Sequence, residues 1–373
     1  MVMKKLIAIS VVFALVVGAA FAVDLGGEVI STVNVLQGDN VKDSKVTSGA
    51  SMDRVRLQGE AANDDGTFGG WIRVDGKHWS GDPQFDGHAW WKPIDQLKLW
   101  IGSNGGDGFF AKEGNTAWMF YQRATDVGVT VGGENAWGGG FSSGINVRSA
   151  FYGGGIDGGN AFYATISPAD IVDINLELPF FQGGEVGDVL ADLIAQVSLK
   201  FDFGNIALTY AGDSSDATNG NAYVYFNLGS VENLSLDVGV GLTLPGDVEG
   251  QPIAAGLGVK YDVNDAFGLK FRTTASFGGD DKAFRLLADV LPYYTINDSV
   301  KAFLSGGVSM LAPDGGDSVI GFHLNPYIWV GQEWGPAFWA GFKLWTDGQK
   351  GAGDKGDDTK IQWAVPIAIG VSF

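Results

Sequence analysis

The sequence contains no cysteine in 373 residues, and only 11 prolines and 3 histidines. Without cysteine the chain cannot form disulfides, so its stability has to come from a large core or from a surface embedded in lipid. Beyond the N-terminal segment there is no run of about 18 apolar residues, which excludes a transmembrane helix there. An aromatic content of 12% excludes a disordered polymer.

Glycine and acidic residues are in excess. Glycine accounts for 58 residues without a collagen period, and the formal net charge is −19. Glycine in strands permits tight curvature and close approach of neighbouring backbones. An acidic chain repels the phosphates of nucleic acids and attracts cations, so we expect no nucleic acid partner.

The first 22 residues have the pattern of a secretory signal. Lys4 and Lys5 precede an apolar run over residues 6–17, which is too short to span a bilayer as a helix. Small residues follow and end in the A-x-A pattern at residues 20–22. We therefore expect export, cleavage after residue 22, and a mature chain of residues 23–373.

Apolar and polar residues alternate along the mature chain. Residues 234–244 place Leu and Val at every second position, with Ser, Asp, Gly and Thr between them, and residues 267–277 alternate similarly. Strand side chains point to opposite faces in turn, so each segment has one apolar face. Segments of about ten residues suit tilted strands that cross a membrane, with the apolar face toward lipid and the charged face toward a lumen. The alternative is a soluble sandwich whose charged face meets bulk water.

Tight turns alternate with longer connections, as do the periplasmic turns and external loops of membrane barrels. Because both chain ends are expected on the periplasmic side, the strand number should be even. The pattern predicts an all-β fold, a transmembrane up-and-down antiparallel β-barrel of 16 to 20 strands in one domain, with 20 as the best count. The tight turns contain Asn, Asp, Gly or Pro and lie at 63–66, 93–95, 168–170, 203–205, 231–233, 264–265, 297–298 and 334–336.

The last segment, 360–373, has an apolar side that ends on an aromatic residue. It resembles the C-terminal signal of bacterial outer-membrane β-barrels, which the assembly machinery reads before that strand closes the barrel. The residues that carry this resemblance are Trp363, Ile367, Ile369, Val371 and Phe373.

Residues 53–57, 65–70 and 89–102 resemble hairpins of porin-like outer-membrane proteins of spirochaetes. The resemblance covers roughly the first third of the mature chain and the C-terminal strand. It implies a pore-forming protein of the bacterial outer membrane. The implied partners are outer-membrane lipids, small hydrophilic solutes and, during biogenesis, the barrel-assembly machinery and periplasmic chaperones. Porins are often homotrimers, and no residue pattern here defines a subunit interface.

If the apolar faces point outward, more basic than acidic residues line the lumen. In known porins the third external loop commonly folds inward, and here that loop is 104–125, the longest. We expect it to narrow the lumen and to set acid against base across it. The alternative is an outward loop with solvated charges and wall arginines held in ion pairs. The predicted pore-lining residues are Arg54, Arg56, Arg73, Lys98, Arg148, Asp107, Lys112 and Glu113.

Passive diffusion of small hydrophilic solutes or ions is the function that this reading implies. A saccharide-selective channel is one alternative, because inward aromatic rings can stack on sugars. The candidate rings are Trp100, Tyr223, Tyr225 and Trp329. A non-conducting surface adhesin or structural barrel is another alternative, although most of its predicted loops are short.

Signals for catalysis and for cofactors are weak. A G-x-S-x-G match at 140–144 lies in a strand-like stretch, and a G-x-G-x-x-G match at 351–356 has no following helix. His78, His88 and His323 lack the third ligand that a zinc site needs. We expect no enzyme activity, no metal and no cofactor.

Overall fold

The structure is a computed structural model, and side chains at some strand positions are not described. Among the described residues, no helix is both long and apolar enough to span a bilayer. The described residues are 22–40, 42–77, 84–103, 130–131, 134–135, 161–179, 186–212, 220–244, 253–278, 283–312, 314–332, 335–346, 349–350, 354–355 and 360–373.

Nineteen of the described strands form one antiparallel sheet, and a short helix, α6 (Val186–Ala191), precedes β10. Two separate pairs are β6 (Thr130–Val131) with β7 (Glu134–Asn135), and β21 (Gln349–Lys350) with β22 (Asp354–Lys355). The strands of the large sheet are β1 (Ala22–Asp39), β2 (Thr47–Ala62), β3 (Phe68–Lys77), β4 (Gln84–Ile94), β5 (Leu97–Gly102), β8 (Ala161–Ala169), β9 (Val172–Pro179), β10 (Ile194–Phe201), β11 (Gly204–Gly212), β12 (Gly220–Val231), β13 (Leu234–Leu244), β14 (Ile253–Asp262), β15 (Phe267–Gly278), β16 (Ala283–Asn297), β17 (Val300–Ala312), β18 (Val319–Gly331), β19 (Pro336–Gly341), β20 (Lys343–Thr346) and β23 (Ile361–Ser372).

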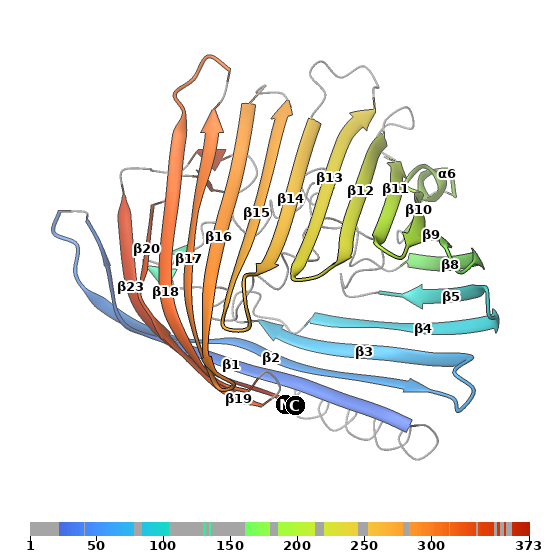
Figure 1. The fold of residues 1–373 in the computed structure, drawn as a ribbon, viewed down its shortest axis with the longest axis horizontal. Helices are drawn as coiled ribbons and strands as arrows, with labels where there is room; N and C mark the ends of the chain where they lie inside the picture. The colour runs from blue at the N-terminus through green and yellow to red at the C-terminus, as the bar shows by residue number, and fades with distance from the viewer. Residues whose placement is uncertain are drawn as a thin grey trace.

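The strand pairings close into a ring (Figure 1). From β1 to β18 the strands of the large sheet pair in chain order, and β1 also pairs with β23 on its other side. β19 and β20 both lie between β18 and β23, so they occupy one position and the 19 strands make 18 positions. The predicted up-and-down antiparallel barrel is confirmed.

The best count of 20 strands is wrong, although 18 lies in the predicted range and is even. The reason is visible at β5, which pairs with β4 on one edge and directly with β8 on the other. Because both edges of β5 are taken, no further strand stands between β5 and β8 in the ring. β6 and β7 fall in this interval and pair only with each other.

Burial along the strands is the reverse of that in a soluble protein. On β18 the apolar Leu324 is 41% exposed, whereas its polar neighbour Asn325 is 1% exposed. On β13 Val240 is exposed and Asp237 is buried. A sandwich would bury the apolar side, so this pattern excludes the soluble alternative and fits an apolar outer surface around a polar interior.

The tight turns lie at one end of the ring, because the strands alternate in direction. Asparagine side chains stabilise several of these turns. The Asn63 carboxamide oxygen accepts hydrogen bonds from the backbone N–H groups of Thr67 and Phe68, both at 2.9 Å. Asn264 binds the N–H groups of Ala266 and Phe267 in the same way. This is the local turn chemistry for which Asn is favoured.

Outward aromatic side chains stand beside these turns. Phe68, Trp91, Phe203, Tyr261 and Tyr294 are all exposed and all lie within a few residues of a tight turn. Aromatic rings at this level form the interfacial girdle of membrane barrels. Of the adjacent residues Trp90 and Trp91, only Trp91 belongs to this girdle, because Trp90 is buried on the inner side.

Candidate functional site on the inner wall

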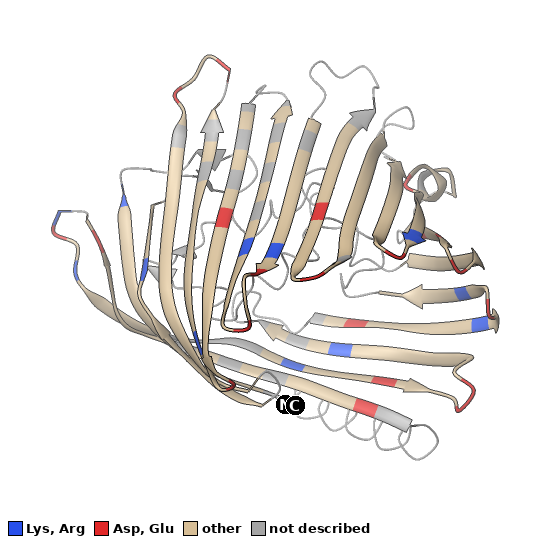
Figure 2. Cartoon of the chain, in the orientation of Figure 1, with Lys and Arg blue, Asp and Glu red and all other residues tan. Residues whose placement is uncertain are grey.

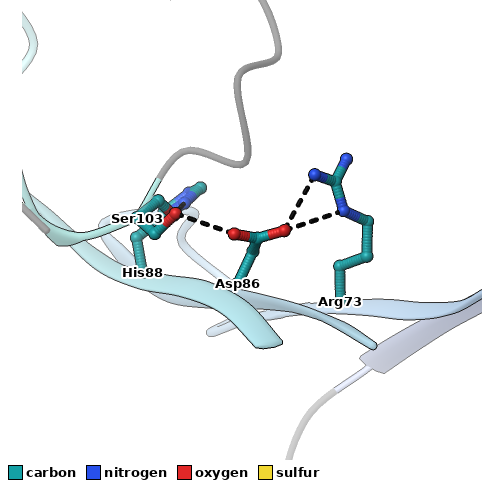
Figure 3. A network of polar contacts seen from close by, with 4 residues as sticks. All are labelled: Arg73, Asp86, His88 and Ser103. Atoms are coloured by element: carbon teal, nitrogen blue, oxygen red, sulfur yellow. Dashed lines mark hydrogen bonds and ion pairs between the residues drawn. The ribbon is translucent and has the colours of Figure 1, made fainter. Parts of the chain in front are cut away.

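A polar network joins β3, β4 and the end of β5 on the inner side of the ring (Figure 3). The Arg73 guanidinium donates from Nε at 3.2 Å and from Nη2 at 2.8 Å to one oxygen of Asp86. The other Asp86 oxygen accepts from the Ser103 hydroxyl at 3.1 Å. Arg73 and Asp86 stand directly opposite each other on their strands. Asp86 therefore neutralises the charge of Arg73. This agrees with the alternative in which ion pairs hold the arginines of the wall.

His88 is fixed in the same network. Its Nδ1 lies 3.2 Å from the Ser103 carbonyl oxygen. A carbonyl oxygen only accepts, so Nδ1 carries the proton of this hydrogen bond. The ring is also stacked between two indoles, with centroid distances of 5.5 Å to Trp71 and 5.0 Å to Trp100. The Trp100 ring in turn lies 6.4 Å from the tilted ring of Tyr163 on β8.

Two positive charges contact this row of rings. The Arg73 guanidinium carbon lies 5.3 Å from the Trp71 ring centroid. The Lys98 ammonium lies 4.1 Å from the Trp100 centroid and 4.7 Å from the Trp90 centroid. Ring faces attract cations without carrying net charge, so these contacts hold the cations without neutralising them. Arg73, Trp71, His88, Trp100 and Lys98 form what we call the β3–β5 column.

A second polar cluster crosses β16, β17 and β18. Asp289, Gly307 and His323 are directly opposite one another on these strands. A Cβ at Gly307 would lie 2.1 Å from Asp289 Oδ1 and 2.5 Å from His323 Cε1, so glycine is what lets the two side chains meet. His323 Nε2 lies 3.6 Å from Asp289 Oδ1 and 3.5 Å from Ser305 Oγ. A hydrolytic triad needs the acid and the serine on opposite ring nitrogens, so this cluster does not have that geometry.

Carboxylates pair with lysines near the tight turns. Lys200 lies 2.5 Å from Asp173, and Lys260 lies 2.9 Å from Asp262. Asp262 also accepts a short hydrogen bond from the Tyr293 hydroxyl, which reaches it across Gly268. This end of the inner wall therefore carries largely balanced charge.

Part of the inner wall is packed rather than open. A buried cluster on β16–β19 and β23 contains Leu291, Phe303, Tyr327, Trp329, Ala337, Trp339 and Ala368. Phe303 and Tyr327 stack with centroids 4.8 Å apart. The candidate sugar-stacking residue Trp329 is buried in this cluster, and Tyr223 and Tyr225 on β12 are buried as well. Trp71, His88 and Trp100, in contrast, remain partly exposed.

The predicted pore-lining residues divide into three groups. Arg56, Arg73 and Lys98 lie on the inner side of β2, β3 and β5, where basic positions recur from strand to strand (Figure 2). Arg54 lies on β2 opposite Lys77, and its side chain is outside the described part. The residues that lie outside the described ranges are Asp107, Lys112, Glu113 and Arg148.

The residues of the C-terminal resemblance share the outer side of β23. Ile369, Val371 and Phe373 are exposed, while the intervening Ala368 is buried. Trp363 and Ile367 fall on the same side by parity. The Phe373 backbone exchanges two hydrogen bonds with Gly27 at 2.7 and 3.1 Å, so the final residue joins the closing seam of the ring.

Asp86, Ser103, Trp71 and the pairing of His88 were not expected from the sequence. Trp71 and His88 are directly opposite each other on β3 and β4, and the alternation of side chains puts both on the inner side. The strand register was therefore the signal that could have found this pair. The G-x-S-x-G match lies outside the described residues, as does most of the G-x-G-x-x-G match. Over the described residues, no group of three or more His, Asp or Glu could hold a metal ion.

A closed antiparallel ring with an apolar exterior and a polar interior defines a transmembrane β-barrel. No family model and no curated protein sequence matches this chain. Solved structures do match it, and several of them are bacterial outer-membrane porin-like barrels. They include OccAB3 of Acinetobacter baumannii (TM-score 0.52, 8% identity, covering 93% of this chain and 99% of that one). They also include an anion-selective porin from Comamonas acidovorans (TM-score 0.51, 12% identity, covering 95% of this chain and 100% of that one). A third is opdK from Pseudomonas aeruginosa (TM-score 0.50, 9% identity, covering 94% of this chain and 99% of that one).

At this level of identity the likeness establishes the fold alone. Particular closeness to spirochaete barrels stays a prediction.

Proposed function

We propose that this protein is a porin of the bacterial outer membrane, a passive channel for small hydrophilic solutes or ions. The observation that carries the proposal is the reversed burial of a closed ring, with Leu and Val outside and Arg, Lys, Asp and Glu inside. Polar side chains inside a membrane barrel line a route for water. Solutes would then cross by diffusion, biased by the wall charges and without any chemical step.

The narrowing of the route by loop 104–125 is part of this proposal. The loop residues Asp107, Lys112 and Glu113 would face basic residues of the neighbouring strands, namely Arg54, Arg56, Arg73 and Lys98. Opposed charges across a narrow passage would set a transverse field and raise the local concentration of opposite ions.

Conductance in a planar lipid bilayer tests the porin proposal. Purified, folded protein should produce discrete current steps of uniform size in KCl solution. The matched control is the same preparation heated to unfolding before addition, which should produce no steps. A protein that inserts as a folded barrel and passes no current would reject the porin and would favour the adhesin or structural barrel.

A saccharide-selective channel is a second candidate, favoured by the partly exposed rings of the β3–β5 column. Aromatic rings can carry sugars by stacking on their apolar faces. Glucose or maltotriose added on one side should then interrupt the ionic current at millimolar concentration. The variant Trp100→Leu should reduce the interruptions, whereas Trp329→Leu, in the packed cluster, is the control. Equal interruptions in both variants would reject a sugar site on the column.

Location and partners follow from the porin proposal. The signal at residues 1–22 would direct export, and the barrel would contact outer-membrane lipids after insertion by the assembly machinery and periplasmic chaperones. A homotrimer is the proposed assembly, and sedimentation in detergent would test it. The proposed mechanism requires no enzyme activity and no cofactor.

A further inference from the structure

The basic side chains on the inner wall are held in two different ways. Arg73, Lys200 and Lys260 each contact a carboxylate within 3 Å, so each pair contributes little net charge. Lys98 instead contacts two indole faces, at 4.1 and 4.7 Å. Within the described part of the wall, no carboxylate lies within ion-pair distance of its ammonium. Lys98 is therefore a cation without a neutralising carboxylate among the described residues, held in place by two rings.

The surroundings of Lys98 suit an anion. The side chain is only partly buried, so its three ammonium N–H donors are not all covered by the rings. Thr165 is directly opposite on β8, and Lys92 on the same hairpin adds a second positive charge, 5.9 Å from the Trp90 ring centroid. The acidic group that acts on Lys98 electrostatically is Glu60 of β2. Glu60 is exposed, so water screens its effect.

We infer that Lys98, held between Trp90 and Trp100, forms an anion-binding station that sets the ion preference of the channel. The inference rests on the proposed porin function and names one residue of its wall as the determinant. The ligand class is a small oxyanion or halide, bound by charge and by ammonium hydrogen bonds. The indole faces hold the ammonium toward the route, so the charge stays in one position rather than being spread by side-chain motion.

The expected size of the effect follows from Coulomb's law. A unit charge about 5 Å from a passing ion in water-like surroundings changes the local ion concentration about fourfold, and screening in 0.1 M salt reduces this to about twofold. The charge enriches chloride and depletes potassium by the same factor, so its removal should lower the ratio of chloride to potassium permeability by about fourfold in 0.1 M salt and by at most about 16-fold without screening. Removal of a neutral ion pair should change the ratio by less than about 1.5-fold.

The experiment measures reversal potentials in a KCl gradient across a planar bilayer. Lys98→Gln should lower the chloride preference, and Lys98→Arg should keep it, because arginine also stacks on indoles and stays charged. The matched control is the double variant Lys200→Gln/Asp173→Asn, which removes a wall ion pair outside the β3–β5 column without changing net charge. Inorganic phosphate is the probe for binding: it should reduce the chloride current in the wild type and in Lys98→Arg, and less in Lys98→Gln.

The inference is overturned if Lys98→Gln conducts with unchanged selectivity and unchanged phosphate inhibition. It is also overturned if the Lys200→Gln/Asp173→Asn variant shifts selectivity more than Lys98→Gln does. A wild-type barrel that passes no current would instead overturn the porin function itself, so the two failures are distinguishable. Heat-dependent mobility in gel electrophoresis verifies that each variant is folded before it is measured.

Discussion

An arginine on the outer face of β2 should destabilise the barrel far more than an arginine one residue further on. Leu57 is 46% exposed on the outer side, whereas the adjacent Gln58 points inward. β2 ends at Ala62, five residues beyond Leu57. At about 3.4 Å per residue and a tilt of about 40°, Leu57 lies about 13 Å from that end, near the middle of an apolar band about 25 Å tall.

The difference in cost between the two substitutions comes from the solvent on each side. Arginine on the lipid face at the bilayer midplane costs about 2–4 kcal/mol in folding free energy. At Gln58 the guanidinium would enter the polar side, where we expect a cost of about 1 kcal/mol or less. Arg73, directly opposite Gln58, is already paired with Asp86, so repulsion there is small.

Reversible unfolding by urea in lipid vesicles, followed by tryptophan fluorescence, measures both variants against the wild type. Leu57→Arg should lower the midpoint strongly and Gln58→Arg only slightly, with similar slopes. Equal losses in the two variants would refute the assignment of the two faces. A loss for Gln58→Arg alone would show that the faces are reversed.

Three further outcomes are expected. Gly307→Ala should lower the free energy of unfolding by about 1–3 kcal/mol, because the added Cβ would collide with Asp289 and His323. The control is Gly306→Ala, which should be tolerated in the same unfolding assay because the atoms nearest to its Cβ lie 3.7 Å away. Deletion of Phe373 should reduce the fraction of assembled barrel in cells, and Phe373→Trp should retain it, as seen by heat-dependent gel mobility. Deletion of residues 108–120 should raise single-channel conductance if loop 104–125 narrows the lumen; unchanged conductance would place that loop outside.

The fold was predictable because its signals are local. A period of two over about ten residues identifies a strand with one apolar face, as in residues 234–244, which form β13. Asn at 63 and 264 marks turns because its side chain bonds the backbone of the turn. The exact strand number was not predictable, since it depends on β5 pairing with β8 across a long stretch of chain.

The candidate site was predictable only in part, because it depends on register. Parity predicts Arg73, Lys98 and Trp100 on the inner side of their strands. Whether a wall cation keeps its charge depends on what stands opposite it, and one sequence does not give that pairing. Asp86 neutralises Arg73, while Trp90 and Trp100 hold Lys98 without neutralising it. His88, read from the sequence as an isolated histidine, is fixed by Ser103 and two indoles.

The central claim is that the apolar face of each strand contacts lipid and the polar face contacts water, and an accessibility scan of β2 tests it most directly. Because the chain has no native cysteine, single-cysteine variants can be labelled at one position each. Spin labels at consecutive positions 55–60 would be challenged with oxygen, which dissolves in lipid, and with a water-soluble nickel complex. Positions 55, 57 and 59 should respond to oxygen, and positions 56, 58 and 60 to nickel. Odd positions that are shielded from both reagents would mean that the apolar face is buried in protein, and would contradict a channel surrounded by lipid.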